Sequence, residues 1–285
     1  MKKKVLLIGS AGMAGQVIKI ELLKYPNYIE VKDIARNSNI SSPTFMLDVT
    51  NFSEVEKIIV SGRFDYVINC VGILNKSAED NPDLAILVNS YFPHFIESIT
   101  STLQTKIVHI STDCVFSGLK GGYTIADFKD GVGYYAQSKA LGEICNIKDL
   151  TIRTSIIGPD KNKSGIGLFS WFISQKEDVF GYTNAFWSGV TTLQLAKTII
   201  DLIVVEKKIS GIIHLTNNSK ISKYNLLLLI KKIFQLDNVN VLQNDAYCVD
   251  KSLIYDQNAD FPLVPTYDEM IVELKEWMHL NNYTI

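Results

Sequence analysis

Two adjacent tyrosines, Tyr134 and Tyr135, stand shortly before Lys139 in the stretch GVGYYAQSK, residues 131–139. If this stretch is helical, Tyr135 and Lys139 share one face, whereas Tyr134 points about 100° away from its neighbour. A phenol has an ordinary pKa of about 10, and a nearby ammonium group lowers that pKa because it favours the phenolate. Both tyrosines could be ordinary packing residues, but if one of them is a catalytic acid, the geometry favours Tyr135, with Lys139 as its activating partner.

The elements that must position this pair follow from an alternation of apolar runs and amphipathic segments. Strands are expected at KVLLIG, IEVKDIA, TFMLD, DYVINCVG, KIVHIS, LTIRTSII and GIIHLT. Helices are expected over 12–25, 53–60, 83–103, 134–147, 192–205, 223–234 and 267–278. This alternation predicts an α/β fold with a doubly wound parallel sheet that is covered on both faces.

The alternation weakens after about residue 157, where GPDKNKSGIGLFSWF has the glycines, lysines and aromatics of a loop region. We therefore expect a first domain over 1–157 and a smaller C-terminal α/β lobe mainly over 158–285. A later segment near 185–215 is expected to return to the first domain.

Composition excludes several classes of protein. The 285 residues are 47% hydrophobic and carry a net charge of −2, which gives no basic field to attract nucleic acid or an anionic membrane. The longest aliphatic run, LLLLI at 226–230, is far shorter than the roughly 20 residues that span a bilayer. The N-terminal stretch does not read as a signal peptide.

The 4 cysteines and 4 histidines are scattered, so we expect free thiols, no metal site and a cytoplasmic protein.

A glycine-rich turn follows the first strand, where VLLIGSAGMAG leads into the helical pattern QVIKIELLKY. Glycines let the backbone approach a pyrophosphate, whose charge suits the positive end of the following helix. The spacing is GxxGxxG rather than GxGxxG, so on spacing alone a tight strand-to-helix turn is an equal alternative. Its place after the first strand favours dinucleotide binding. The expected contacts are Gly9, Ala11, Gly12, Met13 and Ala14.

The residues after the second strand bear on the choice of dinucleotide. An acidic residue there would bind the adenosine ribose, whereas an arginine could pair with a 2′-phosphate. Arg36, followed by Asn37 and Ser38, favours NADPH. NADH is the alternative if the strand ends earlier and Asp33 is the ribose ligand, and Arg36 could also be a solvated turn charge.

Further cofactor contacts are expected at the carboxyl ends of the next strands, where ligands of open parallel sheets bind. Asp48, followed by Val49, is placed to approach the adenine. Cys70, Val71 and Gly72 close the following strand with small side chains that let a cofactor lie against the backbone. The simpler alternative is that these three residues only end a buried strand.

Four features now stand in one order: GxxGxxG at 9–15, NCVG at 69–72, STDCVFSG at 111–118 and YxxxK at 135–139. This combination resembles an extended short-chain dehydrogenase/reductase. The phrases VINCVG, AEDNPDLAILVNS, HISTDCVFSG, YYAQSKALGE and IRTSIIG resemble the dTDP-4-dehydrorhamnose reductase family. The resemblance is clear from residue 3 to about 160. It implies an NAD(P)-binding Rossmann domain, a small lobe that closes over a nucleotide-linked sugar, and reduction of a 4-keto group in polysaccharide or deoxysugar synthesis.

The resemblance also implies roles for single residues. Thr112 matches the hydroxyl that hydrogen-bonds the keto oxygen, with Ser111 a less favoured neighbour. Tyr135 matches the proton donor. Lys139 matches the residue that binds the nicotinamide ribose and tunes the tyrosine.

The sugar pocket is where this chain departs from the family. Cys114 stands where the family usually has tyrosine, Ile156 replaces a tryptophan, and WSGVTT lacks a proline before its threonine. The activity class therefore transfers better than the particular sugar. The candidate substrate contacts are Asn75, Asn89, Cys114, Phe116, Ile156, Trp171 and Trp187. The aromatic members could equally pack in the core of the small lobe, and Asn89 matches an asparagine that supports the site in many relatives.

Other functions stay open on the same fold. A dehydratase is disfavoured because Asp113 is followed by Cys114 rather than by glutamate, whereas an epimerase is harder to separate. The regulatory subunit of methionine adenosyltransferase resembles the same family, so a non-catalytic NADP-binding role is a further alternative. A homodimer fits the family, although the apolar face of LAILVNSYF could instead pack on the sheet.

Overall fold

The computed structural model describes residues 1–37, 43–161, 167–255 and 263–283. Its centre is a parallel sheet of seven strands in the order β11-β6-β5-β4-β1-β2-β3. These strands are β1 (Lys3–Ile8), β2 (Ile29–Ala35), β3 (Phe45–Met46), β4 (Tyr66–Asn69), β5 (Lys106–Thr112), β6 (Leu150–Thr154) and β11 (Gly211–His214). They are the seven strands that the apolar runs predict, and the predicted doubly wound α/β fold is confirmed.

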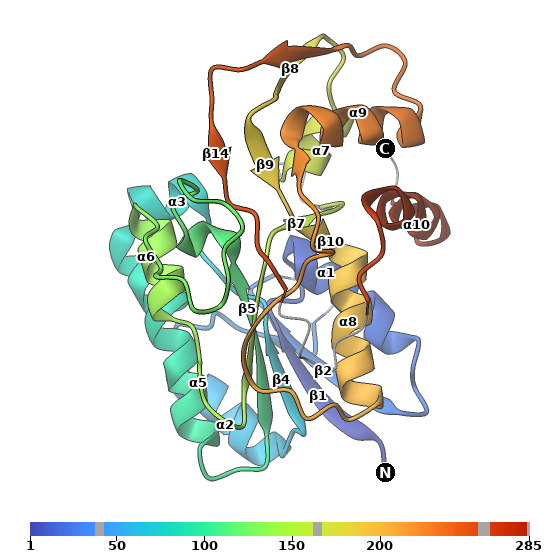
Figure 1. Ribbon diagram of the computed structural model, residues 1–285. Helices are drawn as coiled ribbons and strands as arrows, with labels where there is room; N and C mark the ends of the chain where they lie inside the picture. The colour runs from blue at the N-terminus through green and yellow to red at the C-terminus, as the bar shows by residue number, and fades with distance from the viewer. Residues whose placement is uncertain (38–42, 162–166, 256–262, 284–285) are drawn as a thin grey trace.

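The two faces of the sheet are buried in separate cores because side chains alternate along each strand. Val5 and Leu7 of β1 belong to one core and Leu6 and Ile8 to the other. The first core includes α1 (Met13–Leu23) and α8 (Thr192–Val204), and the second includes α2 (Phe52–Gly62) and α5 (Phe92–Thr100). Figure 1 shows α5 on one side of the sheet and α8 on the other.

The chain returns to the large sheet after residue 158. Helix α8 packs against α1, and β11 pairs with β6 at the edge of the sheet. The predicted strand LTIRTSII is divided, since β7 (Ile156–Ile157) leaves the large sheet and pairs with β10 (Val190–Thr191). The carboxyl ends of β6 and β7 therefore lie where the two parts of the chain meet.

Among the described residues, the rest of the second half builds two small sheets and three helices, the first of which is α7 (Leu168–Ile173). One sheet has the order β12-β9-β14, from β12 (Ile221–Ser222), β9 (Ala185–Trp187) and β14 (Val249–Asp250). The other pairs β13 (Val241–Asn244) with β8 (Val179–Tyr182). Ser222 caps α9 (Lys223–Phe234), and a Thr266–Glu269 capping box starts α10 (Tyr267–Leu280).

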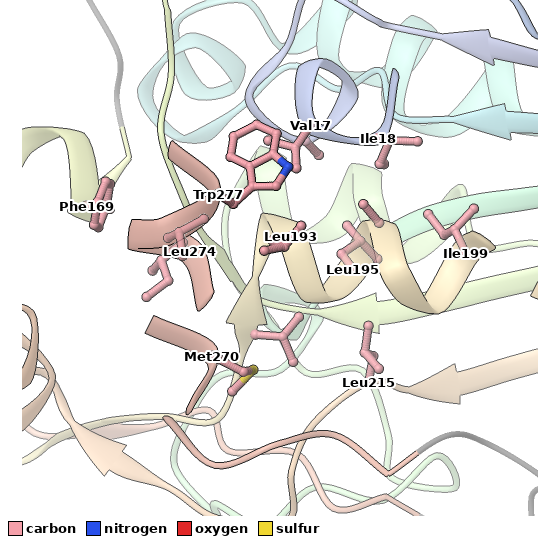
Figure 2. Packing of buried hydrophobic residues seen from close by; sticks show 14 of the residues in the cluster. Val17, Ile18, Phe169, Leu193, Leu195, Ile199, Leu215, Met270, Leu274 and Trp277 are labelled. Carbon is pink, nitrogen blue, oxygen red and sulfur yellow. The ribbon is translucent and has the colours of Figure 1, made fainter. Parts of the chain in front are cut away.

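Helix α10, near the C-terminus, packs against helices that cover the large sheet. Its side chains Met270, Leu274 and Trp277 share a core with α1 and α8, and Figure 2 shows Trp277 beside Val17. The Trp277 indole also donates a hydrogen bond to Glu21 of α1. In the described part of the chain no helix is long and apolar enough to cross a membrane.

Two predicted helices are shorter than expected. The segment 83–103 is divided into α4 (Pro82–Ala85), a π-helical segment η1 (Ile86–Tyr91) and α5. Helix α6 (Tyr134–Leu141) ends before residue 147, and the backbone of Gly142 lies against Asn89 so closely that a Cβ there would be 1.8 Å from its carbonyl oxygen. The short helices α3 (Asn75–Asp80) and α7 (Leu168–Ile173) have no counterpart among the predicted elements.

Candidate active site

A cavity of about 510 Å³ opens at the carboxyl ends of β1, β2 and β4. Ten of the predicted cofactor contacts line it: Gly9, Ala11, Gly12, Arg36, Asn37, Asp48, Val49, Cys70, Val71 and Gly72. Met13 and Ala14 lie in the first turn of α1 and are not among the residues that line the cavity. Ser38 is outside the described residues. The cavity has the size and place expected for a cofactor site in an open α/β sheet.

The glycine turn has the geometry that a bound pyrophosphate requires. Gly9 has φ +90°, and a Cβ there would lie 2.9 Å from Val71 Cγ2. A Cβ on Gly15 would lie 2.1 Å from the Gly9 carbonyl oxygen, so this glycine lets α1 pack on the turn. Among the described residues, none caps α1 with its side chain, and its first turn has no acidic residue. The positive end of α1 is therefore free to receive an anion.

The two candidates for recognition of the adenosine ribose have different surroundings. Asp33 is inside β2 and 2% exposed, and it forms an ion pair with Lys19 and accepts hydrogen bonds from the amide and hydroxyl of Thr44. Arg36 directly follows β2 and lines the cavity. Burial raises the pKa of nearby Asp48, but hydrogen bonds from Thr50 and the charge of Arg36 bring it below its usual value. Arg36 is therefore better placed than Asp33 to contact the adenosine ribose end of a dinucleotide in this cavity.

Thr112 and Tyr135 come together at the end of β5, the strand next to β4, and neither they nor Lys139 are among the residues that line the cavity. Thr112 is the last residue of β5, and its hydroxyl accepts a hydrogen bond from the Cys114 amide at 3.1 Å. Burial raises the pKa of the half-buried Tyr135 phenol well above its usual value, and hydrogen bonding to Thr112 lowers it only in part. Tyr134 is 47% exposed on the outside of α6. The helix therefore presents Tyr135, and not Tyr134, to the end of β5.

Lys139 lies one turn beyond Tyr135 in α6 and is 4% exposed. Its ammonium group donates a hydrogen bond to the Ile110 carbonyl at 2.7 Å. Burial lowers the pKa of Lys139 to about 8, against the opposing effects of Glu143 and Cys70. The expected lowering of the Tyr135 pKa by Lys139 is not seen: burial raises this pKa, and the opposing contribution comes from the hydrogen bond with Thr112.

Asn89 supports the site from within the protein. Its side chain accepts a hydrogen bond from the Ile73 amide at 2.8 Å and donates to the Ile73 carbonyl at 2.9 Å and to the Ser138 hydroxyl at 3.0 Å. It is fully buried. We therefore correct its assignment as a substrate contact: Asn89 is a positioning residue that joins the loop after β4 to α6.

A buried ionic network of Arg153, Glu143 and Ser111 lies next to Thr112 in the sequence and the sheet, and no sequence pattern predicted it. The Arg153 guanidinium binds both carboxylate oxygens of Glu143 at 2.7 and 2.8 Å, and the Ser111 hydroxyl donates to the same carboxylate at 2.7 Å. Burial raises the pKa of Glu143, but Arg153 and Ser111 bring it below the usual value. The available signal was an arginine within the apolar strand LTIRTSII, since a buried charge needs a partner.

Two more substrate candidates are core residues. Phe116 is fully buried and stacks on Tyr123, with ring centroids 4.2 Å apart. Trp187 is 6% exposed and packs against Tyr267. These two assignments are corrected, because both rings are covered by the protein itself.

The remaining candidates are accessible. Asn75 is exposed at the start of α3, Trp171 is 40% exposed on α7, and Ile156 is partly buried in β7. Cys114 is partly buried beside Thr112, and burial raises the pKa of its thiol to about 11. Its sulfur is therefore a neutral pocket atom at pH 7.

Metal ligation has no support in the described part of the chain, where no group of three or more His, Cys, Asp or Glu side chains could hold an ion. All four cysteines are free thiols. His109, inside β5, is fully buried and contacts the side-chain amide of Asn69 at 3.2 Å.

The parallel sheet, the glycine turn at its first strand and the Tyr-x-x-x-Lys helix define the class as an extended short-chain dehydrogenase/reductase. Within it, the model of the family described as RmlD substrate binding domain matches residues 3–253. This chain belongs to that family, and the predicted resemblance is confirmed.

Curated relatives are moderately similar. A probable low-salt glycan biosynthesis reductase of Haloferax volcanii is 23% identical over 225 residues, which are 75% of this chain and 74% of the relative. A dTDP-4-dehydrorhamnose reductase of Mycobacterium tuberculosis is 35% identical over 102 residues, but this match covers only 34% of this chain and 33% of the relative.

Solved structures share the fold over nearly the whole chain. A dTDP-4-dehydrorhamnose reductase of Bacillus anthracis in complex with NADP has a TM-score of 0.81 and 24% identity, covering 97% of this chain and 100% of the other. A UDP-Glc/GlcNAc 4-epimerase of Campylobacter jejuni has a TM-score of 0.74 at 12% identity, covering 98% of this chain and 99% of the other. The fold therefore accommodates more than one reaction.

Proposed function

We propose that this protein is an NADPH-dependent reductase of the 4-keto group of a nucleotide-activated 4-keto-6-deoxy sugar, in surface polysaccharide or deoxysugar biosynthesis. The observation that carries the proposal is the meeting of Thr112 and Tyr135 at the end of β5, next to β4, whose following residues line a cavity that suits a dinucleotide. The family and the reductase names of its relatives support the same reaction.

The cavity residues fit NADPH. The amides at the start of α1 and the Gly9 turn would hold the pyrophosphate, and Arg36 would pair with the 2′-phosphate. When bound, NADPH supplies the hydride that reduces the carbonyl carbon.

The protein's own groups would act on the carbonyl oxygen. The Thr112 hydroxyl holds this oxygen, and Tyr135 donates its proton as negative charge develops there. The raised pKa keeps the Tyr135 phenol protonated at neutral pH, although burial makes it a weaker acid than an ordinary tyrosine. Lys139, with a pKa of about 8, is mainly an ammonium ion at pH 7 and would donate to the nicotinamide ribose.

We further propose that the two parts of the chain bind different ligands. Residues 1–157, with the segment that forms α8 and β11, would bind the cofactor, and the rest of 158–285 would bind the sugar nucleotide. The reaction would take place in the cytoplasm. Homodimer formation and the lack of nucleic-acid binding stay predictions, to be tested by sedimentation and by electrophoretic mobility shift.

The test is NADPH oxidation by the purified protein with a panel of 4-keto-6-deoxy sugar nucleotides. A reductase consumes one NADPH for each sugar reduced, whereas an epimerase converts its sugar without net consumption. Binding of NADPH without turnover of any panel member, together with tight association with another protein, would favour a regulatory role instead.

A further inference from the structure

Glu143 continues the spacing of the candidate catalytic pair. Tyr135, Lys139 and Glu143 follow one another at intervals of four residues, and α6 is helical as far as its C-cap at Gly142. Side chains four residues apart on a helix lie on the same face, one turn from each other. Lys139 and Glu143 are both buried. A buried carboxylate therefore lies about one turn beyond the buried ammonium group.

Lys139 and Glu143 are bound to adjacent residues of β5. The Lys139 ammonium group donates a hydrogen bond to the Ile110 carbonyl at 2.7 Å, and the Glu143 carboxylate accepts one from the Ser111 hydroxyl at 2.7 Å. Thr112 is the next residue of this strand. The strand that carries the Thr112 hydroxyl therefore holds both charged groups near its carboxyl end.

Glu143 is the carboxylate that other cations on this side of the sheet also contact. Arg153, 2% exposed, binds both of its oxygens, and the Lys129 ammonium group lies 3.2 Å from one of them. The Arg153 guanidinium also contacts His214 Nε2 at 3.2 Å. Burial lowers the pKa of His214 to about 4, so that imidazole adds no charge at pH 7. Loss of the Glu143 charge would leave these cations uncompensated.

Two further titratable groups face Lys139 from neighbouring strands. Cys70 directly follows β4, and His109 lies within β5. Burial raises the pKa of the Cys70 thiol to about 12 and lowers the pKa of the His109 imidazole well below its usual value. Both groups are therefore neutral at pH 7. Neither of them offers Lys139 the negative charge that Glu143 carries.

Other titratable groups contact α6 at residues other than its lysine. Glu79 accepts a hydrogen bond from the Tyr135 amide at 3.1 Å. Burial raises the pKa of the Tyr135 phenol, and the charge of Asp113 acts in the same direction. His94 contacts the Leu141 carbonyl at 2.8 Å. These contacts lie at the two ends of the helix.

We propose that Glu143 is a positioning residue of the reductase, whose buried carboxylate keeps the Lys139 ammonium group charged. The inference rests on the proposed function, in which this cation donates to the nicotinamide ribose. A buried ammonium group has lost its hydration and favours the neutral form unless an anion compensates it. The same carboxylate binds Ser111, so one side chain sets the charge of the lysine and joins the end of α6 to β5.

The direct test measures the pKa of Lys139 by NMR titration of the protein with isotope-labelled lysine, and Lys139→Met identifies the signal. The wild-type signal should titrate at a pH of about 8. Glu143→Gln should lower this pKa by about one pH unit, because the carboxylate is lost while the charges of Arg153 and Lys129 stay. Ser111→Ala is the matched control, since it removes a hydrogen bond to the same carboxylate but no charge. It should leave the Lys139 pKa near that of the wild type.

A second variant guards against loss of folding in Glu143→Gln, which leaves Arg153 buried without its partner. Lys129→Met removes a cation whose side chain is 35% exposed, so the fold should be kept. With one cation fewer beside the carboxylate, the Lys139 pKa should rise by a few tenths of a pH unit, opposite in sign to the effect of Glu143→Gln. The alkaline limb of the kcat/KM profile should move in the same direction as the pKa in each variant.

Three results would overturn the inference. The first is a Lys139 pKa that stays unchanged in both Glu143→Gln and Lys129→Met, even if thermal stability falls. The second is a shift in Ser111→Ala as large as that in Glu143→Gln, since packing rather than charge would then set the ionisation of Lys139. The third is a wild-type kcat/KM that does not depend on the Lys139 charge. Shifts of the expected sign in a protein that reduces no keto sugar would contradict the proposed reaction and leave the electrostatic role of Glu143 standing.

Discussion

The side-chain amide of Asn89 donates a hydrogen bond to the hydroxyl of Ser138, with 3.0 Å between the two atoms. Ser138 lies between Tyr135 and Lys139 in α6, whereas Asn89 lies in the π-helical segment η1. The same asparagine holds the backbone of Ile73, next to the cofactor cavity. One buried side chain thus joins the helix of the candidate catalytic pair to the wall of the cavity.

Replacing this asparagine should destabilise the protein. Asn89→Ala removes three hydrogen bonds and leaves polar groups of Ile73 without their partner, so we expect a loss of about 2–4 kcal/mol in the free energy of unfolding. Urea unfolding followed by circular dichroism measures this loss. Asn81→Ala is the control, because Asn81 is exposed and its side chain makes one weak bond to the Ser77 carbonyl. Similar losses in the two variants would contradict the positioning role of Asn89.

The two tyrosines should differ sharply in catalysis. Tyr135→Phe removes the proposed proton donor, and we expect the rate of keto-sugar reduction to fall by about 10²-fold or more. The affinity of the Tyr135→Phe variant for NADPH, measured by fluorescence titration, should stay near that of the wild type. Tyr134→Phe should have a small effect, because that side chain is 47% exposed. Comparable losses of reduction rate in both variants would contradict the assignment of Tyr135 as the proton donor.

Activity should decline in mildly alkaline solution. Because burial lowers the pKa of Lys139 to about 8, its ammonium form is present at pH 7 and is lost as the pH rises through this value. If the cation is required, kcat/KM should fall by roughly tenfold per pH unit above pH 8. Tyr135 does not cause this fall, since its raised pKa keeps the phenol protonated there. A pH profile that is flat to pH 9.5 would show that the Lys139 charge is dispensable.

Arg36 should select between the two nicotinamide cofactors. Arg36→Ala removes the guanidinium group from the cavity wall, and we expect the Kd for NADPH to rise about tenfold or more, because a charge-assisted pair with the 2′-phosphate is lost. NADH lacks this phosphate and serves as the matched control ligand, with little expected change. Equal weakening of both cofactors would place the effect of Arg36 on the shape of the cavity rather than on the phosphate.

Much of the fold and of the reaction site is encoded in local patterns. All seven strands of the large sheet correspond to predicted runs, and the central strands β1 and β4 are almost continuously apolar because both of their faces are buried. The i, i+4 spacing singled out Tyr135 over Tyr134, since helix geometry fixes which side chains share a face. The position of Arg36 at the cavity was likewise predicted, because it directly follows an apolar strand.

Other features depend on contacts between segments that are far apart in the sequence. Gly142 lies against Asn89 at the end of α6, and the aromatic rings of Phe116 and Trp187 turn inward because Tyr123 and Tyr267 cover them. Periodicity predicts which residues are apolar but not which neighbours bury them. Lys251 looks like an ordinary surface charge in the sequence, and only the long-range contact of its segment with Gly118 places its stem against the segment that carries Thr112. The candidate catalytic pair thus follows from local spacing, whereas the burial of the proposed substrate contacts depends on the tertiary structure, because segments far apart in the sequence cover them.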